Sequence, residues 1–297
     1  MCASSANLGP GFDCLGLAVG LELRVRARPA ERDRFVYAGE GRVEASADNL
    51  IHRGFGAAYR AAAGTTAPAV RIEADNPVPL ARGLGSSSAA LVAGALLGDA
   101  AAGGALGPDG VFQLTADLEG HPDNVAPALY GGVTVSAHGD EGWRAEVLPW
   151  PEGWRLLFGV PSFEVPTDRA RAVLPERLAR GDAVRTAART ALWPVAVLRE
   201  RPELLRVASQ DVAHEPFRHP LLPGFAEAQA ALREAGAWAA YLSGAGPTLG
   251  VVCSDEALPT CRGILERYAG PDGRVLAPDV GTAARVSGRF AAAPAAP

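Results

Sequence analysis

A glycine-rich turn that leads directly into an apolar helix is the feature that most constrains this chain. Residues 79–90 read Pro-Leu-Ala-Arg-Gly-Leu-Gly-Ser-Ser-Ser-Ala-Ala, and the Ala- and Leu-rich pattern behind them predicts a helix to about Leu97. Gly83 and Gly85 allow backbone angles that a side chain forbids. The first N–H groups of a helix have no internal partner and lie at the positive end of its dipole, and serine hydroxyls can add donors or a metal ligand. The run therefore predicts either a phosphate-binding loop or a simple turn with an N-capping serine.

Two common nucleotide-binding motifs are excluded. The turn lacks the Gly-Lys-Ser or Gly-Lys-Thr of a P-loop, and its glycines are not spaced as in a dinucleotide fingerprint. It resembles the phosphate-binding motif of the GHMP small-molecule kinases, which hold the ATP triphosphate on a Gly-Leu-Gly-Ser-Ser turn. One departure is Ser88, where that family more often has alanine. The resemblance implies that ATP is bound by Pro79, Leu80, Ala81, Arg82, Gly83, Leu84, Gly85, Ser86, Ser87, Ser88 and Ala89, with Asn49 near the base.

Composition limits the classes of partner. The 297 residues are 48% hydrophobic and 21% charged, which is enough for one large or two ordinary domains with cores. The net charge of -5 offers no basic excess for nucleic acid, and no apolar run or leader pattern predicts a membrane partner or secretion. The four cysteines form no Cys-x-x-Cys pair, so we expect neither a zinc site nor a disulfide framework, and a reducing cytoplasm fits best.

The opening segment carries polar groups at Ser4, Ser5, Asn7 and Asp13, and we expect so polar and glycine-rich a start to lie outside the core. Taken alone, Asn7 and Asp13 could be turn residues that bond their own backbone. The segment resembles the opening signature of homoserine kinases within the GHMP family. That resemblance implies that both residues bind the ammonium and hydroxyl-bearing part of homoserine, with Asp13 also counted as catalytic. A strand precedes this loop in the family, whereas only two residues do here, so we expect either a misassigned start or a missing edge strand.

A predicted helix over residues 108–119 ends on a carboxylate, Glu119. A carboxylate gains nothing from the negative end of a helix dipole, so Glu119 is either an exposed surface residue or is needed for another reason, such as binding Mg²⁺. The run Glu-Gly-His-Pro-Asp-Asn-Val from residue 119 resembles a homoserine kinase signature, which implies that Glu119 and Ser87 are catalytic and share the metal. We interpret His121 as structural. Tyr130 stands at the offset where mevalonate kinases have an Asp base, which is consistent with transfer without a dedicated carboxylate base.

The second half offers arginines as anion-binding groups, since all 28 basic residues of the chain are arginine. Thr167 is a predicted N-cap that places Arg171 in the first turn of a helix, where a cation is unfavourable unless it faces solvent or binds an anion. Arg218 lies in a proline-rich loop and could be a plain surface residue. The resemblance to homoserine kinases implies that Thr167, Arg171 and Arg218 bind the substrate carboxylate.

Residues 243–248, Ser-Gly-Ala-Gly-Pro-Thr, separate two predicted strands at 239–242 and 249–253. The local sequence alone predicts a turn between the two strands. As the third GHMP motif they would close over the phosphates and the substrate hydroxyl, with Gly246 among the substrate-binding residues. Further strands are predicted at residues 21–28, 69–73, 131–136, 155–160 and 283–286, and further helices at 48–59, 225–235 and 258–268.

The resemblance covers nearly the whole chain and implies a two-domain α+β fold of the GHMP kinase type. Residues 1–150 would form an ATP-binding domain like domain 2 of ribosomal protein S5, and residues 151–297 a ferredoxin-like domain, with a disordered Ala/Pro tail after about residue 290. The implied activity is Mg²⁺-dependent transfer of the ATP γ-phosphate to the hydroxyl of L-homoserine, which gives O-phospho-L-homoserine for threonine biosynthesis. A homodimer is expected only by analogy. Two alternatives stay open, namely another GHMP kinase, such as one acting on mevalonate, and a non-catalytic binding protein on the same fold.

Overall fold

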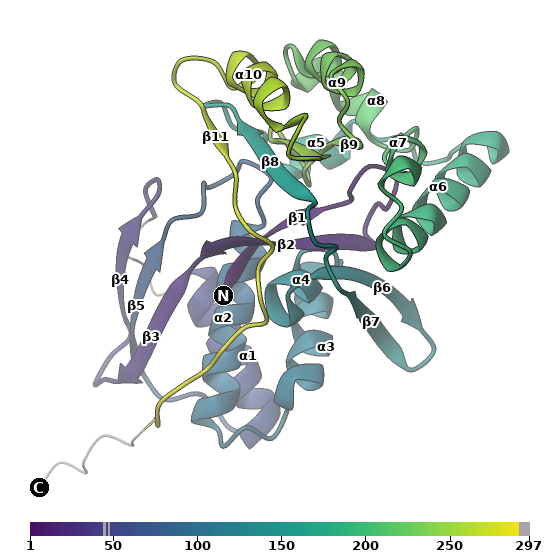
Figure 1. Cartoon of the computed structure of the whole chain (residues 1–297). Helices are drawn as coiled ribbons and strands as arrows, with labels where there is room; N and C mark the ends of the chain where they lie inside the picture. The colour runs from purple at the N-terminus through teal and green to yellow at the C-terminus, as the bar shows by residue number, and fades with distance from the viewer. Residues whose placement is uncertain (44–45, 47, 291–297) are drawn as a thin grey trace, which may run out of the picture.

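The structure is a computed structural model that describes residues 1–43, 46 and 48–290. Its N-terminal half contains two sheets and a layer of helices, and its C-terminal half contains a third sheet covered by helices (Figure 1). This is the α+β arrangement predicted from the sequence. No helix in the described ranges combines the length and the apolar character needed to cross a bilayer.

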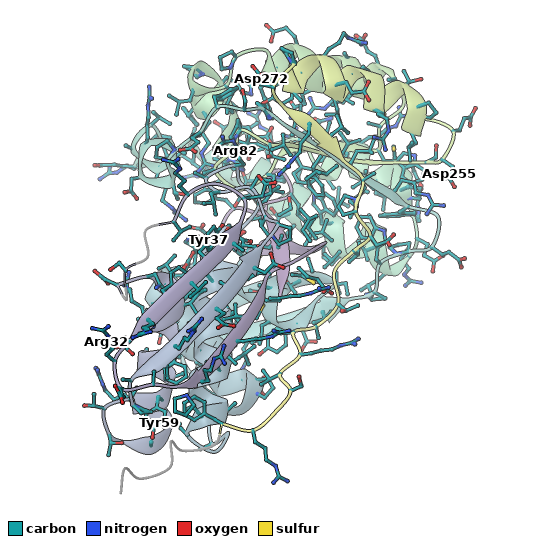
Figure 2. All side chains as sticks on the ribbon, turned by 90° about the vertical axis from the view of Figure 1, so that its left-hand side faces the viewer. Arg32, Tyr37, Tyr59, Arg82, Asp255 and Asp272 are labelled. Atoms are coloured by element: carbon teal, nitrogen blue, oxygen red, sulfur yellow. The ribbon has the colours of Figure 1, made fainter. Side chains whose placement is uncertain are left out.

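Two sheets form the N-terminal half. One is antiparallel with the order β1 (Cys2–Ala6), β2 (Leu15–Glu22), β6 (Val133–Gly139) and β7 (Gly142–Leu148). The other has the order β3 (Arg24–Pro29), β5 (Val70–Asn76) and β4 (Arg34–Gly39), with β4 and β5 parallel. In Figure 2 this second sheet faces the viewer, with Tyr37 at the end near the C-terminal half and Arg32 at the opposite end. The alternation along β3 leaves its three arginines exposed.

Four helices pack against these sheets, namely α1 (Leu50–Ala63), α2 (Ser86–Ala101), α3 (Gly107–Glu119) and α4 (Val125–Tyr130). Apolar side chains of α1 and α2, including Ile51, Phe55 and Ala93, form one core cluster with Ile72 of β5. This core fixes the N-terminus of α2 above the β3–β5–β4 sheet. The glycine-rich turn therefore lies at a defined position on the edge of the N-terminal half.

The opening segment belongs to the core, contrary to prediction. Cys2–Ala6 forms β1, and Ser4 and Ser5 are completely buried. Ser4 Oγ donates to Asn124 Oδ1 at 2.9 Å, and Ser5 Oγ lies 2.7 Å from Ser243 Oγ, so partners 120 and 238 positions away in sequence compensate for the lost hydration. Because β1 pairs with β2 ahead of the loop at Asn7, the second of the two alternatives, a missing edge strand, was also wrong.

The C-terminal half is an antiparallel sheet with the order β11 (Arg274–Leu276), β8 (Arg155–Val160), β10 (Leu249–Cys253) and β9 (Ala239–Leu242). The bounds of β8, β9 and β10 agree with the predicted strands. The helices of this half are α5 (Thr167–Ala172), α6 (Arg180–Leu198), α7 (Leu205–Ala208), α8 (Glu215–Arg218), α9 (Phe225–Glu234) and α10 (Leu258–Ala269), with 3-10 turns at Pro202–Leu204 and His219–Leu221.

Two local predictions in this half were wrong. The N-cap of α5 is Pro166, and no side chain caps the helix, so Thr167 is its first residue. Since α5 has only six residues, Arg171 lies in its last turn, and the dipole does not disfavour a cation there. The cation of Arg171 therefore has to be explained by its contacts.

The C-terminal segment returns to the N-terminal half instead of forming a strand at residues 283–286. It bridges β2 through Val19 and Val280, and Thr282 bridges Gly131 (Figure 1, yellow). The largest core cluster also contains residues from both halves, such as Leu15 and Phe158. The boundary near residue 150 stays a prediction, and the predicted disordered tail lies outside the described residues from 291 onward.

Candidate active site

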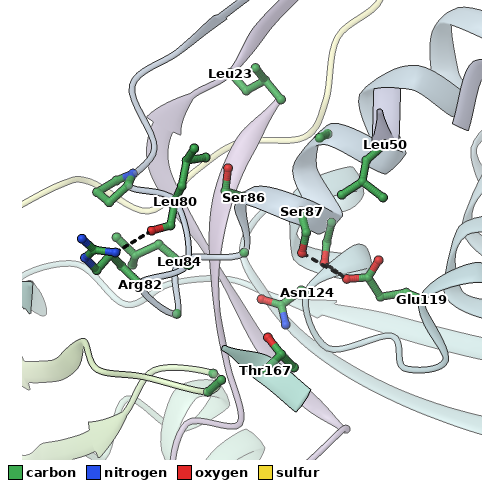
Figure 3. A pocket seen from close by; sticks show the side chains of 18 of the residues that line it. Leu23, Leu50, Leu80, Arg82, Leu84, Ser86, Ser87, Glu119, Asn124 and Thr167 are labelled. Atoms are coloured by element: carbon green, nitrogen blue, oxygen red, sulfur yellow. Dashed lines mark hydrogen bonds between the residues drawn. The ribbon is translucent and has the colours of Figure 1, made fainter. Parts of the chain in front are cut away.

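A cavity of about 760 Å³ lies between the two halves and is lined by residues from all three motifs and from α5. Figure 3 shows its phosphate-turn side, with Ser86, Ser87 and Glu119 from the N-terminal half and Thr167 from the C-terminal half facing the same space. Such a concave site between halves is a usual place for a ligand. The cavity brings together residues that the sequence places up to 238 positions apart, as Asn7 and Ala245 are.

The glycine-rich turn has the backbone of an anion-binding loop. Gly83 and Gly85 have φ of +76° and +63°, and a Cβ would lie 2.2 Å from Ser243 O at the first and 1.9 Å from Ser4 Oγ at the second. The N-cap of α2 is Gly85, so no serine side chain caps the helix. Among the described residues, the N–H groups of Ser86, Ser87 and Ser88 have no protein acceptor. These free donors favour the phosphate-binding interpretation over the capping one.

The predicted ATP-binding residues 79–88 all line this cavity, and so does Asn49. Asn49 is also the N-cap of α1, since its Oδ1 accepts N–H bonds from Ile51 at 3.0 Å and His52 at 3.1 Å. Ala89 does not line the cavity because it is buried in the core beneath α2. Part of the cavity wall is apolar and aromatic, with Phe35, Tyr37 and Leu50 among the lining residues.

Glu119 extends from the end of α3 toward the serines of the turn. Its Oε1 accepts hydrogen bonds from Ser88 Oγ at 2.6 Å and from Ser87 Oγ at 3.4 Å (Figure 3). Ser87 was predicted as the partner, yet the buried Ser88 is nearer and Ser87 is exposed. A carboxylate and two hydroxyls beside a phosphate loop are the hard oxygen donors that Mg²⁺ prefers, so the residues present fit this ion.

Asp13 and Arg171, which also line the cavity, form a two-pronged ion pair. Arg171 Nη2 donates to Asp13 Oδ1 at 2.7 Å and Nη1 donates to Oδ2 at 3.2 Å. The neighbouring Asn7 is buried, and its Oδ1 accepts the Asp13 N–H while its Nδ2 donates to Gly244 O at 3.1 Å. The loop that carries Asn7 and Asp13 is thereby attached to both the third motif and α5.

Arg218 is buried beside this pair. Its side chain donates to Ala170 O at 3.1 Å and to Gly244 O at 3.0 Å, and it lines the cavity. Burial, helped by the positive charge of Arg171, lowers the pKa of Arg218 to about 10, so the guanidinium is still charged at neutral pH. The alternative that Arg218 is a surface residue is therefore excluded. The Phe12 ring lies 5.2 Å from Arg171 Cζ and 5.4 Å from Arg218 Cζ, and the aromatic face favours both cations.

Comparison with known proteins agrees with this geometry. The family models "GHMP kinases N terminal domain" and "GHMP kinases C terminal" match residues 49–132 and 195–267. Homoserine kinase of Thermus thermophilus is 51% identical over 280 residues, covering 94% of each chain, and that of Deinococcus radiodurans is 45% identical over 249 residues, covering 83% of this chain and 81% of its own. The crystal structure of homoserine kinase from Cytophaga hutchinsonii superposes with a TM-score of 0.83 at 27% identity, covering 95% of this chain and 94% of its own.

The chain belongs to the homoserine kinases of the GHMP kinase family. Members of this kinase family are phosphotransferases that use ATP. This membership favours the homoserine kinase prediction over both alternatives, because relatives that are homoserine kinases align with 94% and 83% of this chain.

One acidic side chain of this homoserine kinase site, Asp123, was not predicted from the sequence, and one basic side chain, His121, was interpreted as structural. Asp123 and His121 lie with Asp13 in a cluster whose ligand atoms are within 4.8 Å of one another, and Asp123 is buried. His121 Nδ1 lies 2.8 Å from Asp123 Oδ1. Burial lowers the pKa of His121, but the bond and charge of Asp123 outweigh it, so the pKa is raised overall. Asp123 stands in the same short signature as Glu119, which was the available signal.

Of three other positions named in the sequence analysis, only one lines the cavity. Thr167 lines it, whereas Gly246 does not, because the backbone of Gly246 packs behind Gly83 while Gly244 and Ala245 face the space. Tyr130 lies away from the cavity, and its hydroxyl donates to Asp109 Oδ1 at 3.0 Å. The position of the mevalonate kinase base therefore carries no cavity carboxylate in this chain.

Proposed function

We propose that this chain transfers the γ-phosphate of ATP to the side-chain hydroxyl of L-homoserine and forms O-phospho-L-homoserine. The observation that carries the proposal is the juxtaposition, in one cavity, of free helix N–H donors and the Asp13–Arg171 pair. The first set suits a polyphosphate and the second suits a zwitterionic amino acid. A kinase for an amino acid needs both.

The nucleotide would lie along the glycine-rich turn. Its phosphates would accept from the free N–H groups at the start of α2, where the helix dipole adds positive charge. Its base would lie against the apolar lining residues Phe35, Tyr37 and Leu50. The close approach of the backbone to the phosphates depends on Gly83 and Gly85, because a side chain at either position would collide with its surroundings.

Glu119 and Ser87 would hold Mg²⁺. When bound, the ion would neutralise charge on the β- and γ-phosphate oxygens. Ser88 would orient Glu119, because its hydroxyl bonds to the same carboxylate oxygen at 2.6 Å and is buried.

The amino acid would exchange partners with the resident ion pair. Its carboxylate would take Arg171 and Arg218, and its ammonium group would take Asp13 and the neighbouring Asp123. Each charged group would then gain a partner of opposite sign as it loses one. A substrate without an ammonium group, such as mevalonate, would leave the charge of the partly buried Asp13 unpaired, which is unfavourable.

The chemistry then depends on position. The substrate hydroxyl oxygen forms the new bond to phosphorus, the bond from phosphorus to the β–γ bridging oxygen breaks, and ADP leaves while the hydroxyl proton passes to water. Asp13 contributes by holding the ammonium group, and so orients the hydroxyl chain toward the turn. In phosphoryl transfer, most of the catalysis comes from positioning the reactants and from fixed positive charge. This mechanism does not require a carboxylate base, and the position of Tyr130 supplies none to the cavity.

Location and assembly are further parts of the proposal. All four cysteines are free thiols, which supports a reducing cytoplasm. A homodimer stays a prediction by analogy with the family.

The test is ADP release with Mg-ATP and a panel of L-homoserine, L-threonine, L-serine and mevalonate. We expect the largest kcat/KM with homoserine, and Arg171→Ala should raise its KM by roughly 10- to 100-fold because two charge-assisted hydrogen bonds are lost. Arg26→Ala, on the exposed face of β3, is the matched control and should leave every constant unchanged. Comparable turnover with mevalonate, or an unchanged homoserine KM in Arg171→Ala, would contradict the proposal.

A further inference from the structure

We propose that His214 is a positioning residue, whose neutral ring accepts a hydrogen bond from Arg218 and so fixes the guanidinium for the substrate carboxylate. This inference rests on the proposed function, because it assigns Arg218 to the substrate. It adds a residue that touches neither the substrate nor the nucleotide.

The surroundings of His214 define which ring nitrogen carries the proton. The side chain is completely buried, and its Nε2 lies 2.7 Å from Gly9 O and 3.5 Å from Asp211 Oδ2. Both of these atoms are acceptors, so Nε2 must carry the hydrogen. Nδ1 lies 3.0 Å from Arg218 Nη1, which can only donate. Nδ1 is therefore the unprotonated nitrogen and accepts from the arginine.

A second proton on this ring would be unfavourable. It would lie on Nδ1 and point at a guanidinium that is itself charged and buried. The nearby Asp211 carboxylate is already occupied by the N–H groups of Ala213, His214 and Glu215, at 2.8, 2.8 and 2.7 Å. These bonds also fix the backbone of His214. Burial is the main reason that the pKa of His214 is lowered, in agreement with a neutral ring.

The bond from His214 completes the attachment of Arg218. The guanidinium also donates from Nε to Ala170 O, at 3.1 Å, and from Nη1 to Gly244 O, at 3.0 Å. Its Nη2 has no protein acceptor among the described residues. The fork is thus held through one edge, and Nη2 stays available for a carboxylate in the cavity that Arg218 lines.

His214 also connects Arg218 to the opening loop. Its Nε2–H bonds to Gly9 of that loop, and its ring lies 5.2 Å from the ring of Phe12, which both cavity arginines face. The His214 side chain therefore contacts both the loop that carries Asp13 and the arginine of α8. Losing the acceptor should loosen Arg218 without removing its charge, which predicts a weaker substrate complex and an intact ATP site.

Two isosteric variants separate the two ring nitrogens. In His214→Gln the amide can reach the Nε2 position and donate to Gly9 O, but no acceptor remains for Arg218. In His214→Asn the side-chain carbonyl can take the Nδ1 position and accept from Arg218, but the bond to Gly9 is lost. We expect His214→Gln to raise the homoserine KM roughly 10-fold or more, since the lost bond involves a charged group, with the ATP KM unchanged. His214→Asn should keep the homoserine KM within about 3-fold of wild type despite a lower Tm. If the homoserine KM of the two variants instead rises in proportion to their loss of Tm, the proposal is overturned.

Arg218→Ala, measured in parallel, separates failure of this inference from failure of the proposed function. If Arg218→Ala leaves the homoserine KM unchanged, the assignment of Arg218 to the substrate is wrong. If it raises KM while His214→Gln does not, the positioning role is wrong and the function stands. The double variant should be no worse than Arg218→Ala alone, because His214 acts through Arg218, and additive losses would contradict this.

A measurement on the wild-type protein keeps the inference testable if the variants fail to fold. Nitrogen NMR of ¹⁵N-labelled histidine distinguishes the ring tautomers. We expect the His214 ring to be neutral at pH 7, with hydrogen on Nε2 and none on Nδ1. A protonated Nδ1 would overturn the proposal.

Discussion

Replacement of Gly85 by alanine tests whether the glycine-rich turn is built as described. Gly85 has a φ of +63°, which costs an L-residue about 1–2 kcal/mol. Its Cβ would also lie 1.9 Å from Ser4 Oγ and 2.8 Å from Asn124 Oδ1, two atoms that are hydrogen-bonded to each other. Relieving such overpacking typically costs about 1–3 kcal/mol. We therefore expect Gly85→Ala to reduce the free energy of unfolding by about 2–5 kcal/mol.

Gly64 provides a matched control. It lies at the C-cap of α1 with a φ of +69°, and a Cβ there would have nothing within 4 Å. Gly64→Ala should therefore lose only the backbone contribution, about 1–2 kcal/mol. Any change in the entropy of the unfolded chain is common to both glycine-to-alanine changes, so the difference between the two variants reports the collision alone.

Urea unfolding and calorimetric titration with ATP measure the two consequences. Gly85→Ala should weaken ATP binding by roughly 10-fold or more, because the displaced turn no longer presents its N–H groups together, and Gly64→Ala should leave binding unchanged. The second substitution Ser4→Ala removes the colliding oxygen, so Gly85→Ala should cost about 1–2 kcal/mol less in that background than in wild type. Equal losses at the two glycines, or strict additivity with Ser4→Ala, would refute the reasoning.

Glu119→Gln and Ser88→Ala should differ in effect. The first removes the charge proposed for Mg²⁺ and should lower kcat by roughly 100-fold or more, whereas the second removes only the bond that orients Glu119 and should lower Mg²⁺ affinity by roughly 10-fold. Kinetics across a Mg²⁺ titration measures both, and indistinguishable variants would contradict the assignment. Burial raises the pKa of Glu215 to about 7 from an ordinary 4.5, although the Leu242 N–H and the Gln229 amide donate to it. The folded state then holds a proton that the unfolded chain releases, so this group should make stability fall by about 3 kcal/mol as pH rises from 4.5 to 7. Denaturant unfolding of Glu215→Gln should show a flatter pH dependence over that window, and an unchanged slope would exclude Glu215 as its source.

Continuous patterns in the sequence predicted much of the fold. The apolar runs of β8, β9 and β10 are buried on both faces, and their predicted bounds agree with the structure. The glycine turn and the helix behind it were predicted because backbone freedom, free N–H groups and helix propensity are properties of adjacent residues. The same holds for the predicted helix that ends at Glu119.

Predictions failed where a residue's surroundings come from elsewhere in the chain. Ser4 and Ser5 were predicted outside the core because they are polar, yet their partners Asn124 and Ser243 compensate for burial. The strand predicted near residue 283 is absent because that segment bonds instead along β2 and beside Gly131. No local pattern contains this information.

The sequence by itself determined which chemical groups are present and in what order, because motif spacing and local propensity are properties of neighbouring residues. The tertiary structure decided which of those groups meet. Arg171 pairs with Asp13, which lies 158 positions away in the sequence. Arg218 is buried among residues from three separate segments, and this burial lowers the pKa of its guanidinium. Hydrogen bonding and desolvation act over a few ångströms in space, whatever the separation in sequence, so only the folded chain could assign Ser88 to Glu119 and His214 to Arg218.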